Sequence, residues 1–124
     1  MIKKKAVTSN DLAEAAIRGI QEVKGHDILS IDLRSIQNSV SDIFIICHGT
    51  SRTQVEAIAR SVEKTIYNEV NEWPAHKEGK ENAEWILLDY FNIVIHIFNE
   101  EAREFYNLEK LWADADVKQI EYQP

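Results

Sequence analysis

The run Ile43-Phe44-Ile45-Ile46-Cys47 constrains the fold of this chain more than any other segment. Five consecutive apolar residues leave no polar face, so a strand of this composition is buried on both faces. Ser41-Asp42 precedes the run and Gly49 follows it, and both are typical strand boundaries. The run therefore predicts a central strand of a β-sheet.

The segment after Gly49 changes to the period of a helix. Ser51 and Gln54 have the spacing of a capping box, which is typical of a helix start. Apolar residues then recur every three or four positions over about five turns. This stripe consists of Val55, Ile58, Ala59, Val62, Ile66 and Val70. A strand, a tight loop with Gly and a helix in that order form half of a crossover unit.

The rest of the chain predicts further strands and a helix near each end. Helical spacing predicts the first helix, which Gly25 ends, and alternating apolar and polar residues predict the next strand. The expected elements are a helix at 9–24, strands at 28–33 and 43–47, a helix at 51–70, a surface loop at 71–82, strands at 85–89 and 93–98, a helix at 99–112 and a short strand at 117–122. This order predicts an α/β fold, a mixed β-sheet flanked by helices, within one domain over residues 1–124.

Two local details follow from residue spacing near the C-terminus. Tyr90, Phe91 and Asn92 separate two strands closely enough for an antiparallel hairpin, whose turn is expected to place Asn92 at positive φ. In the last helix, the core stripe is expected to contain Phe105, Leu108 and either Leu111 or Trp112. Tyr106 and Glu109 share an adjoining face, which favours the surface for both.

The charge balance indicates the kind of partner. Fourteen Lys and Arg residues oppose twenty-one Asp and Glu residues, which leaves a net charge of -7. Such a surface repels phosphate backbones unless its positive charges are strongly clustered. A basic protein is therefore the expected partner, with no direct nucleic-acid specificity.

Cysteine usage and the apolar stretches indicate the compartment. The single cysteine, Cys47, lies within the apolar run, which excludes an intramolecular disulfide and a zinc site of several cysteines. Lys3 to Lys5 are followed by the polar stretch 8–11, so no signal peptide is expected. The apolar stretches are far below the ~20 residues that cross a bilayer. We therefore expect a soluble cytoplasmic protein without membrane association.

One loop invites an enzymatic interpretation. Gly49-Thr50-Ser51 enters a helix N-terminus, where free backbone N–H groups and the helix dipole can hold a phosphate. A nucleotidyltransferase would also need two or three carboxylates on the following strands to hold magnesium, and strand 85–89 supplies only Asp89. The loop also lacks the Lys-Ser/Thr of a Walker motif. A tight turn before a helix is the favoured interpretation, and nucleotide binding is the alternative.

Cysteine and histidine residues offer little further chemistry. Cys47 and His48 are neighbours on a strand, so their side chains point to opposite faces and cannot form a nucleophile–base pair. We expect Cys47 to be a buried structural thiol. The four histidines lack metal-ligand spacing, and no metal or cofactor is expected. His96 and Asp89 could form a structural hydrogen bond across the hairpin.

Aromatic residues at the C-terminal end favour recognition over catalysis. Large rings among charges of both signs have the composition of a binding hot spot. These rings are Trp85, Tyr90, Phe105, Tyr106 and Trp112. The pattern alone predicts an acidic protein-binding module that is not an enzyme.

Longer strings of the sequence resemble a known family. They are Trp85-Ile86-Leu87-Leu88-Asp89-Tyr90, Ile93-Val94-Ile95-His96-Ile97-Phe98 and Arg103-Glu104-Phe105-Tyr106-Asn107-Leu108-Glu109-Lys110-Leu111-Trp112, preceded by Ser41 to Ile46, Gly49 to Val55 and Glu78-Gly79. This ordered set covers nearly the whole chain and is similar to the signature of the ribosomal silencing factor family, also called Iojap-like proteins.

The resemblance implies a fold, a partner and a mechanism. Members have a nucleotidyltransferase-like fold without the catalytic carboxylates. They bind the large ribosomal subunit through its ribosomal protein number fourteen and sterically block joining of the small subunit, which represses translation under nutrient limitation. Members are also homodimers when free, so a homodimer is expected.

The resemblance also implies the residues of the partner contact. The matched positions lie on the hairpin and the last helix, namely Trp85, Asp89, Tyr106, Leu108, Glu109 and Trp112. Tyr106 and Trp112 would supply apolar area with a polar tip, and Glu109 would meet a basic side chain. Leu108 would fill a shallow pocket on the partner unless it packs in the core. Arg103 is expected to form an ion pair with Asp89.

The sequence departs from the family pattern at one turn. The family has Gly-Asp between the hairpin strands, whereas this chain has Phe91-Asn92. The substitution removes the residue that adopts positive φ most easily. Phe91 is also a candidate apolar contact at an exposed tip.

Overall fold

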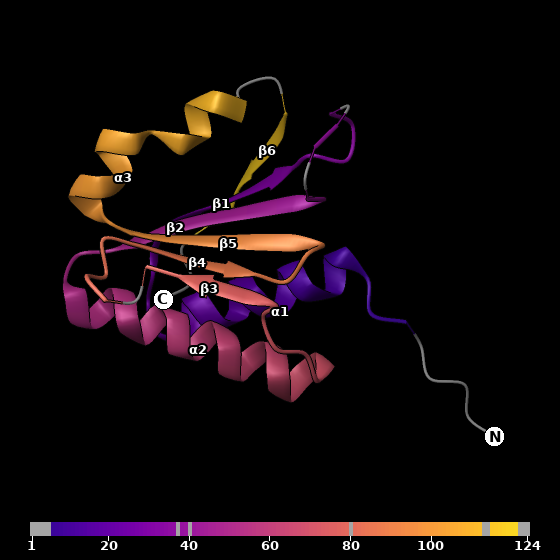
Figure 1. Cartoon of the computed structure of the whole chain (residues 1–124), viewed down its shortest axis with the longest axis horizontal. Coiled ribbons are helices and arrows are strands. Elements are labelled where there is room, and N and C mark those ends of the chain that lie inside the picture. Colours follow the sequence, from indigo (N-terminus) through magenta and orange to yellow (C-terminus); the bar gives the residue numbers. More distant parts are fainter. Residues whose placement is uncertain (1–5, 37, 40, 80, 113–114, 122–124) are drawn as a thin grey trace.

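The computed structural model describes residues 6–36, 38–39, 41–79, 81–112 and 115–121 of the chain (Figure 1). Its elements are α1 (Ser9–Glu22), β1 (His26–Asp32), β2 (Ile43–Gly49), α2 (Arg52–Val70), β3 (His76–Glu78), β4 (Trp85–Asp89), β5 (Ile93–Asn99), α3 (Glu100–Tyr106), the 3-10 helix η1 (Leu108–Trp112) and β6 (Asp116–Gln119). The predicted mixed α/β architecture is confirmed.

The six strands form one sheet in the order β3-β4-β5-β2-β1-β6. β2 and β5 are parallel, and all other neighbouring strands are antiparallel. All seven residues of β2 are buried, which confirms the predicted central strand. The apolar run is therefore covered on both faces because helices lie on both sides of the sheet (Figure 1).

The two long helices, α1 and α2, cover one face, here called the inner face (Figure 1). Strand residues that point to this face include Ile45, Cys47 and Ile95, and all are fully buried. The helices approach closely at Gly19, where an added Cβ would lie 2.8 Å from the Cα of Val62. This contact explains the need for glycine within α1.

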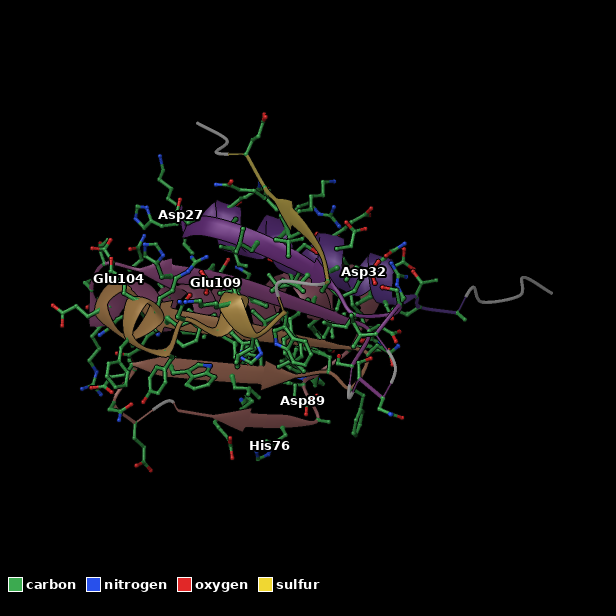
Figure 2. The ribbon with its side chains drawn as sticks, turned by 90° about the horizontal axis from the view of Figure 1, so that it is seen from above. Asp27, Asp32, His76, Asp89, Glu104 and Glu109 are labelled. Carbon is green, nitrogen blue, oxygen red and sulfur yellow. The ribbon has the colours of Figure 1, made fainter. Side chains whose placement is uncertain are left out.

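The shorter elements, α3 and η1, lie on the opposite face, here called the outer face (Figure 2). A second and smaller apolar cluster lies beneath them. Its buried members are Ile31, Leu33, Phe44, Ile46, Val94 and Phe98. Because side chains alternate along a strand, β1, β2, β4 and β5 each supply residues to both clusters. The layer packs over β5 and β2, so the β3–β4 edge extends beyond it.

The predicted surface loop at 71–82 is partly wrong, because it contains the edge strand β3. His76 and Glu78 lie opposite Asp89 and Leu87 of β4 in an antiparallel ladder. All three residues of β3 are exposed. A fully exposed strand of three residues has no apolar period, so only pairing with β4 defines it.

The predicted helix at 99–112 is broken at Asn107. Asn107 adopts the left-handed conformation that ends α3, with φ of 47°. The chain then continues as η1 in a different direction, which changes the face that each residue presents. Phe105 is therefore 81% exposed, and its predicted core position is wrong. Of the two alternatives Leu111 and Trp112, Leu111 is 73% exposed. Leu108 and Trp112 do pack against the outer cluster.

The hairpin turn differs from the prediction by one residue. Phe91, and not Asn92, has positive φ, at 68°. The Asp89 carboxylate accepts a hydrogen bond from the Phe91 N–H at 2.8 Å. The Ser41 hydroxyl donates to the carbonyls of Phe91 and Asn92 at 3.0 Å and 2.8 Å. Tertiary hydrogen bonds thus hold a bulky residue in a conformation that favours glycine.

The C-terminal strand is present at Asp116–Gln119, where it pairs with β1 at the sheet edge. Residue 122, the predicted end of this strand, lies outside the described residues. Within the described ranges, no helix is both long enough and apolar enough to span a membrane.

Candidate functional site

The loop after Gly49 joins the ends of the two inner helices. The Ser51 hydroxyl caps α2 by accepting from the Gln54 N–H at 3.1 Å. The Gln54 side-chain oxygen accepts from the Thr50 N–H at 2.8 Å, and its amide nitrogen donates to the Lys24 carbonyl at 3.1 Å. The Thr50 N–H, a candidate for phosphate binding, is therefore occupied by a side chain of this protein. The geometry fits the turn-and-cap interpretation.

Cys47 and His48 point to opposite faces of β2. Cys47 is fully buried in the inner cluster, and burial raises the pKa of its thiol to about 12. The thiol therefore stays protonated at neutral pH, as a structural cysteine does. Within the described ranges, no group of three or more His, Cys, Asp or Glu side chains gathers in a way that could hold a metal ion.

The outer face holds the predicted recognition residues of β4. Trp85 is half-buried, and its ring lies 4.8 Å from that of Phe98 and 4.9 Å from that of Tyr106. The Trp85 indole N–H donates to Nδ1 of His96 at 3.1 Å. Trp85 is thus fixed in orientation by one hydrogen bond and two aromatic contacts.

His96 does not pair with Asp89, so that predicted hydrogen bond is wrong. The β4–β5 register places His96 opposite Leu87 and Asp89 opposite Val94. Burial lowers the pKa of His96 to about 4, so its ring is neutral at pH 7. A neutral ring with Nδ1 unprotonated can accept the Trp85 proton.

Tyr106 lies at the surface, as predicted, with 47% of its area exposed. It ends α3 and stands beside Trp85 on the outer face. Phe105 contacts it edge-on at 5.2 Å between ring centroids. Leu108 and Trp112 instead support this surface from below, because both are partly buried against the outer cluster, and Trp112 meets Phe44 edge-on at 5.7 Å.

Glu109 belongs to a separate polar cluster around Arg103, which is only 8% exposed. The guanidinium donates to Glu109 at 3.2 Å, to the Asp27 carbonyl at 2.7 Å and contacts Nδ1 of His48 at 2.9 Å. The predicted pair between Arg103 and Asp89 is therefore wrong. Burial and the Arg103 charge lower the pKa of His48. This cluster fastens α3 and η1 to β1 and β2.

Sequence reasoning missed this role of Arg103 and the contribution of β3 to the outer face. A single Arg in a charged helix carries no signal that distinguishes a buried guanidinium from an exposed one. The β4 residues Trp85 and Asp89 share the outer face with Tyr106, whereas Glu109 faces the Arg103 cluster. The structure thus brings Trp85, Asp89 and Tyr106, half of the predicted contact residues, to one open surface. Leu108 and Trp112 of η1 instead pack against the outer cluster.

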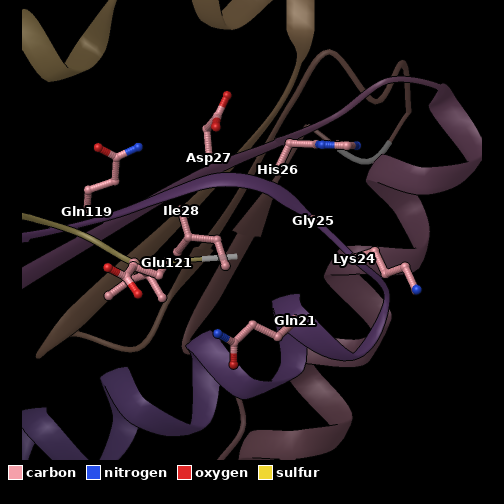
Figure 3. A pocket seen from close by; sticks show the side chains of 9 residues that line it. Gln21, Lys24, Gly25, His26, Asp27, Ile28, Gln119 and Glu121 are labelled. Carbon is pink, nitrogen blue, oxygen red and sulfur yellow. The ribbon is translucent and has the colours of Figure 1, made fainter. Parts of the chain in front are cut away.

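A pocket of about 350 Å³ lies apart from these residues, between the end of α1 and β1 (Figure 3). Gln21 and Lys24 line it from the helix side, and Gln119 and Glu121 line it from the C-terminal strand side (Figure 3). The pocket contains none of the predicted contact residues.

Comparisons with known proteins agree on one family. The model of the family described as "Ribosomal silencing factor during starvation" matches residues 6–124. The chain is 34% identical over 115 residues to ribosomal silencing factor RsfS of Halalkalibacterium halodurans, covering 93% of this chain and 97% of the relative. A crystal structure of a Chromobacterium violaceum protein aligns with a TM-score of 0.80 at 30% identity, over 86% of this chain and 88% of that one.

A more distant relative occurs in the mouse. It is named mitochondrial assembly of ribosomal large subunit protein 1 and is 36% identical over 74 residues, which span 58% of this chain and 32% of the relative.

Proposed function

We propose that this chain, which belongs to the ribosomal silencing factor family, binds the large ribosomal subunit and sterically blocks joining of the small subunit. The contact on the large subunit is ribosomal protein number fourteen. Translation in the cytoplasm is thereby repressed under nutrient limitation. The mechanism requires neither catalysis nor a cofactor, since its strength depends only on affinity and occupancy.

The observation that supports this proposal most directly is the aromatic surface on the outer face. Trp85 is held by His96 and stands beside the exposed Tyr106, with Asp89 on the same strand. Rigid aromatic rings next to a carboxylate suit recognition of a basic protein. The net charge of -7 strengthens attraction to a basic ribosomal protein and weakens contact with ribosomal RNA. The name of the mouse relative supports the choice of the large subunit.

The proposal extends to the free protein and to the origin of the fold. Phe105 and Leu111 expose large apolar side chains on the covering layer, which favours a homodimer when no ribosome is bound. We further propose that the single domain is nucleotidyltransferase-like and lacks the catalytic carboxylates, since β4 supplies only Asp89.

The test is co-sedimentation with isolated large and small subunits at near-physiological salt, followed by addition of the opposite subunit. We expect binding to large subunits alone and fewer joined ribosomes. Tyr106→Ala should weaken binding roughly 10-fold or more, because the lost ring is a central aromatic contact. Its fold should persist, because nearly half of Tyr106 is exposed.

Tyr67→Ala is the matched control, since Tyr67 is a similarly exposed tyrosine on α2, which covers the inner face. Failure of the wild-type chain to sediment with large subunits would refute the proposed function. Equal binding by the two tyrosine variants would refute the assignment of the contact surface.

A further inference from the structure

A groove of about 330 Å³ opens on the outer face where α3 ends and the β3–β4 edge emerges. Trp85, Leu87 and Tyr106 form its apolar walls, and Glu78 and Glu84 line it with carboxylates. The predicted contact residues include only two of these five. The predicted partner contact therefore does not account for Leu87 and the two carboxylates of the groove.

Strand pairing places one carboxylate beside the apolar wall. Glu78 lies directly opposite Leu87 in the β3–β4 ladder, so both side chains point to the outer face. Gly79 follows with φ of 85°, and an added Cβ would lie only 1.8 Å from the Trp85 carbonyl oxygen. Only glycine lets the chain pass this close to β4. Glu78 and Trp85 therefore line the same groove.

The aromatic wall is organised before any partner arrives. The Trp85 indole is held by its hydrogen bond to His96, and its ring lies 4.9 Å from that of Tyr106. The carboxylates are accessible, because Glu84 is exposed and the Glu78 side chain is 65% exposed in a pair with His76 at 3.0 Å. Such an exposed contact is weak and can be exchanged for another.

We propose that this groove receives an arginine side chain of the protein partner, an inference that rests on the proposed function. A guanidinium stacks on aromatic faces and donates in a fork to carboxylates, and the groove offers both kinds of contact. A lysine side chain would fit this groove less well, because its ammonium group is a compact and strongly hydrated point charge. The net charge of the chain also favours a cationic side chain.

The first test compares large-subunit binding of two double variants. Glu78→Gln with Glu84→Gln removes both carboxylate charges from the groove while keeping side-chain shape. Glu14→Gln with Glu22→Gln removes the same charge from exposed positions of α1, which covers the inner face. We expect the groove variant to bind roughly 10-fold more weakly, and with less salt dependence, than the control variant.

The second test probes the groove without the ribosome. N-acetyl-arginine-N-methylamide is titrated into the 15N-labelled chain while the indole N–H signal of Trp85, assigned with Trp85→Phe, is followed. N-acetyl-citrulline-N-methylamide has nearly the same shape without the charge. We expect the arginine probe to shift this signal in the wild type and not in the groove variant, and the citrulline probe to shift neither.

The two tests separate the inference from the proposed function. If the wild type binds large subunits and both double variants bind equally, the arginine groove is refuted and the proposed function stands. If the wild type binds no subunit, the proposed function is refuted. The probe titration then tests by itself whether the groove binds an arginine side chain. Equal shifts with the arginine and citrulline probes also overturn the inference.

Discussion

The two layers that cover the sheet are held in different ways. The inner layer consists of two long helices on a continuous apolar cluster, which includes the fully buried Ile58 and Ile66. The outer layer consists of one short helix and a 3-10 helix, fastened by a few apolar side chains and by the buried guanidinium of Arg103. We therefore expect the inner layer to contribute more apolar stabilisation than the outer layer. The outer layer instead exposes aromatic side chains that can bind a partner.

The largest expected difference between the layers concerns apolar truncation. Ile58→Ala should lower the free energy of unfolding by about 3 kcal/mol, because the cavity is enclosed by the inner cluster. Leu108→Ala in the outer layer should cost about 1.5 kcal/mol, since Leu108 is only partly buried and its site can relax. Urea unfolding measures both. Equal decreases in the free energy of unfolding would show that the two layers contribute equally to stability.

The next effect concerns the guanidinium that fastens the outer layer. Arg103→Ala should lower the free energy of unfolding by about 2–3 kcal/mol, because the β1 carbonyls and Glu109 lose a buried charged donor. Amide hydrogen exchange should accelerate in α3 and η1 before α2 is affected. Arg34→Ala is the control, since Arg34 pairs with Asp32 at the exposed surface, and we expect it to leave the free energy of unfolding nearly unchanged. Uniform acceleration over the whole chain would contradict a role limited to the outer layer.

A smaller effect is a pH dependence that arises beneath the outer layer. His96 has a folded-state pKa of about 4, below its ordinary value of 6.5. The unfolded chain binds more protons between these two values, so the free energy of unfolding should fall by about 2 kcal/mol as pH drops from about 6.5 to about 4. In His96→Asn, whose oxygen can still accept from Trp85, this contribution should disappear. Identical pH profiles of the two proteins would contradict it.

The smallest effect concerns the hairpin turn. Phe91→Gly should raise the free energy of unfolding by about 1 kcal/mol, because Phe91 has φ of 68° and the residue is 72% exposed. Asn92→Gly is the control and should be neutral or destabilising, since Asn92 has no positive φ to relieve. Thermal unfolding compares the two variants. Weaker large-subunit binding by Phe91→Gly would show that the ring also contacts the partner.

Periodic segments were predicted well because burial itself is periodic. The apolar run of β2 and the stripe of α2 require cover on particular faces, and the structure provides it. The turn was missed by one residue, since the Ser41 hydroxyl donates to the Phe91 carbonyl and the Asp89 carboxylate accepts from the Phe91 N–H, and both bonds stabilise positive φ at Phe91. The Ser41 bond joins residues 50 positions apart, so no local pattern in the turn predicts it.

The candidate site was predicted in composition but not in arrangement. Aromatic residues and carboxylates near the C-terminus indicated recognition, and Trp85 and Tyr106 do stand together on the outer face. The partners of Asp89, His96 and Arg103 were predicted wrongly or not at all. Side-chain pairing depends on strand register and on the break at Asn107, and neither follows from residue spacing.

The sequence by itself determined the central strand, the amphipathic helix after it, the acidic charge and the family, because these depend on local period, composition or ordered motifs. Tertiary structure alone decided that β3 is a strand, that Arg103 is buried and that Glu78 and Trp85 line one groove. The physical reason is that pairing and burial of polar groups are properties of the neighbours that folding brings together, and those neighbours are distant in the chain.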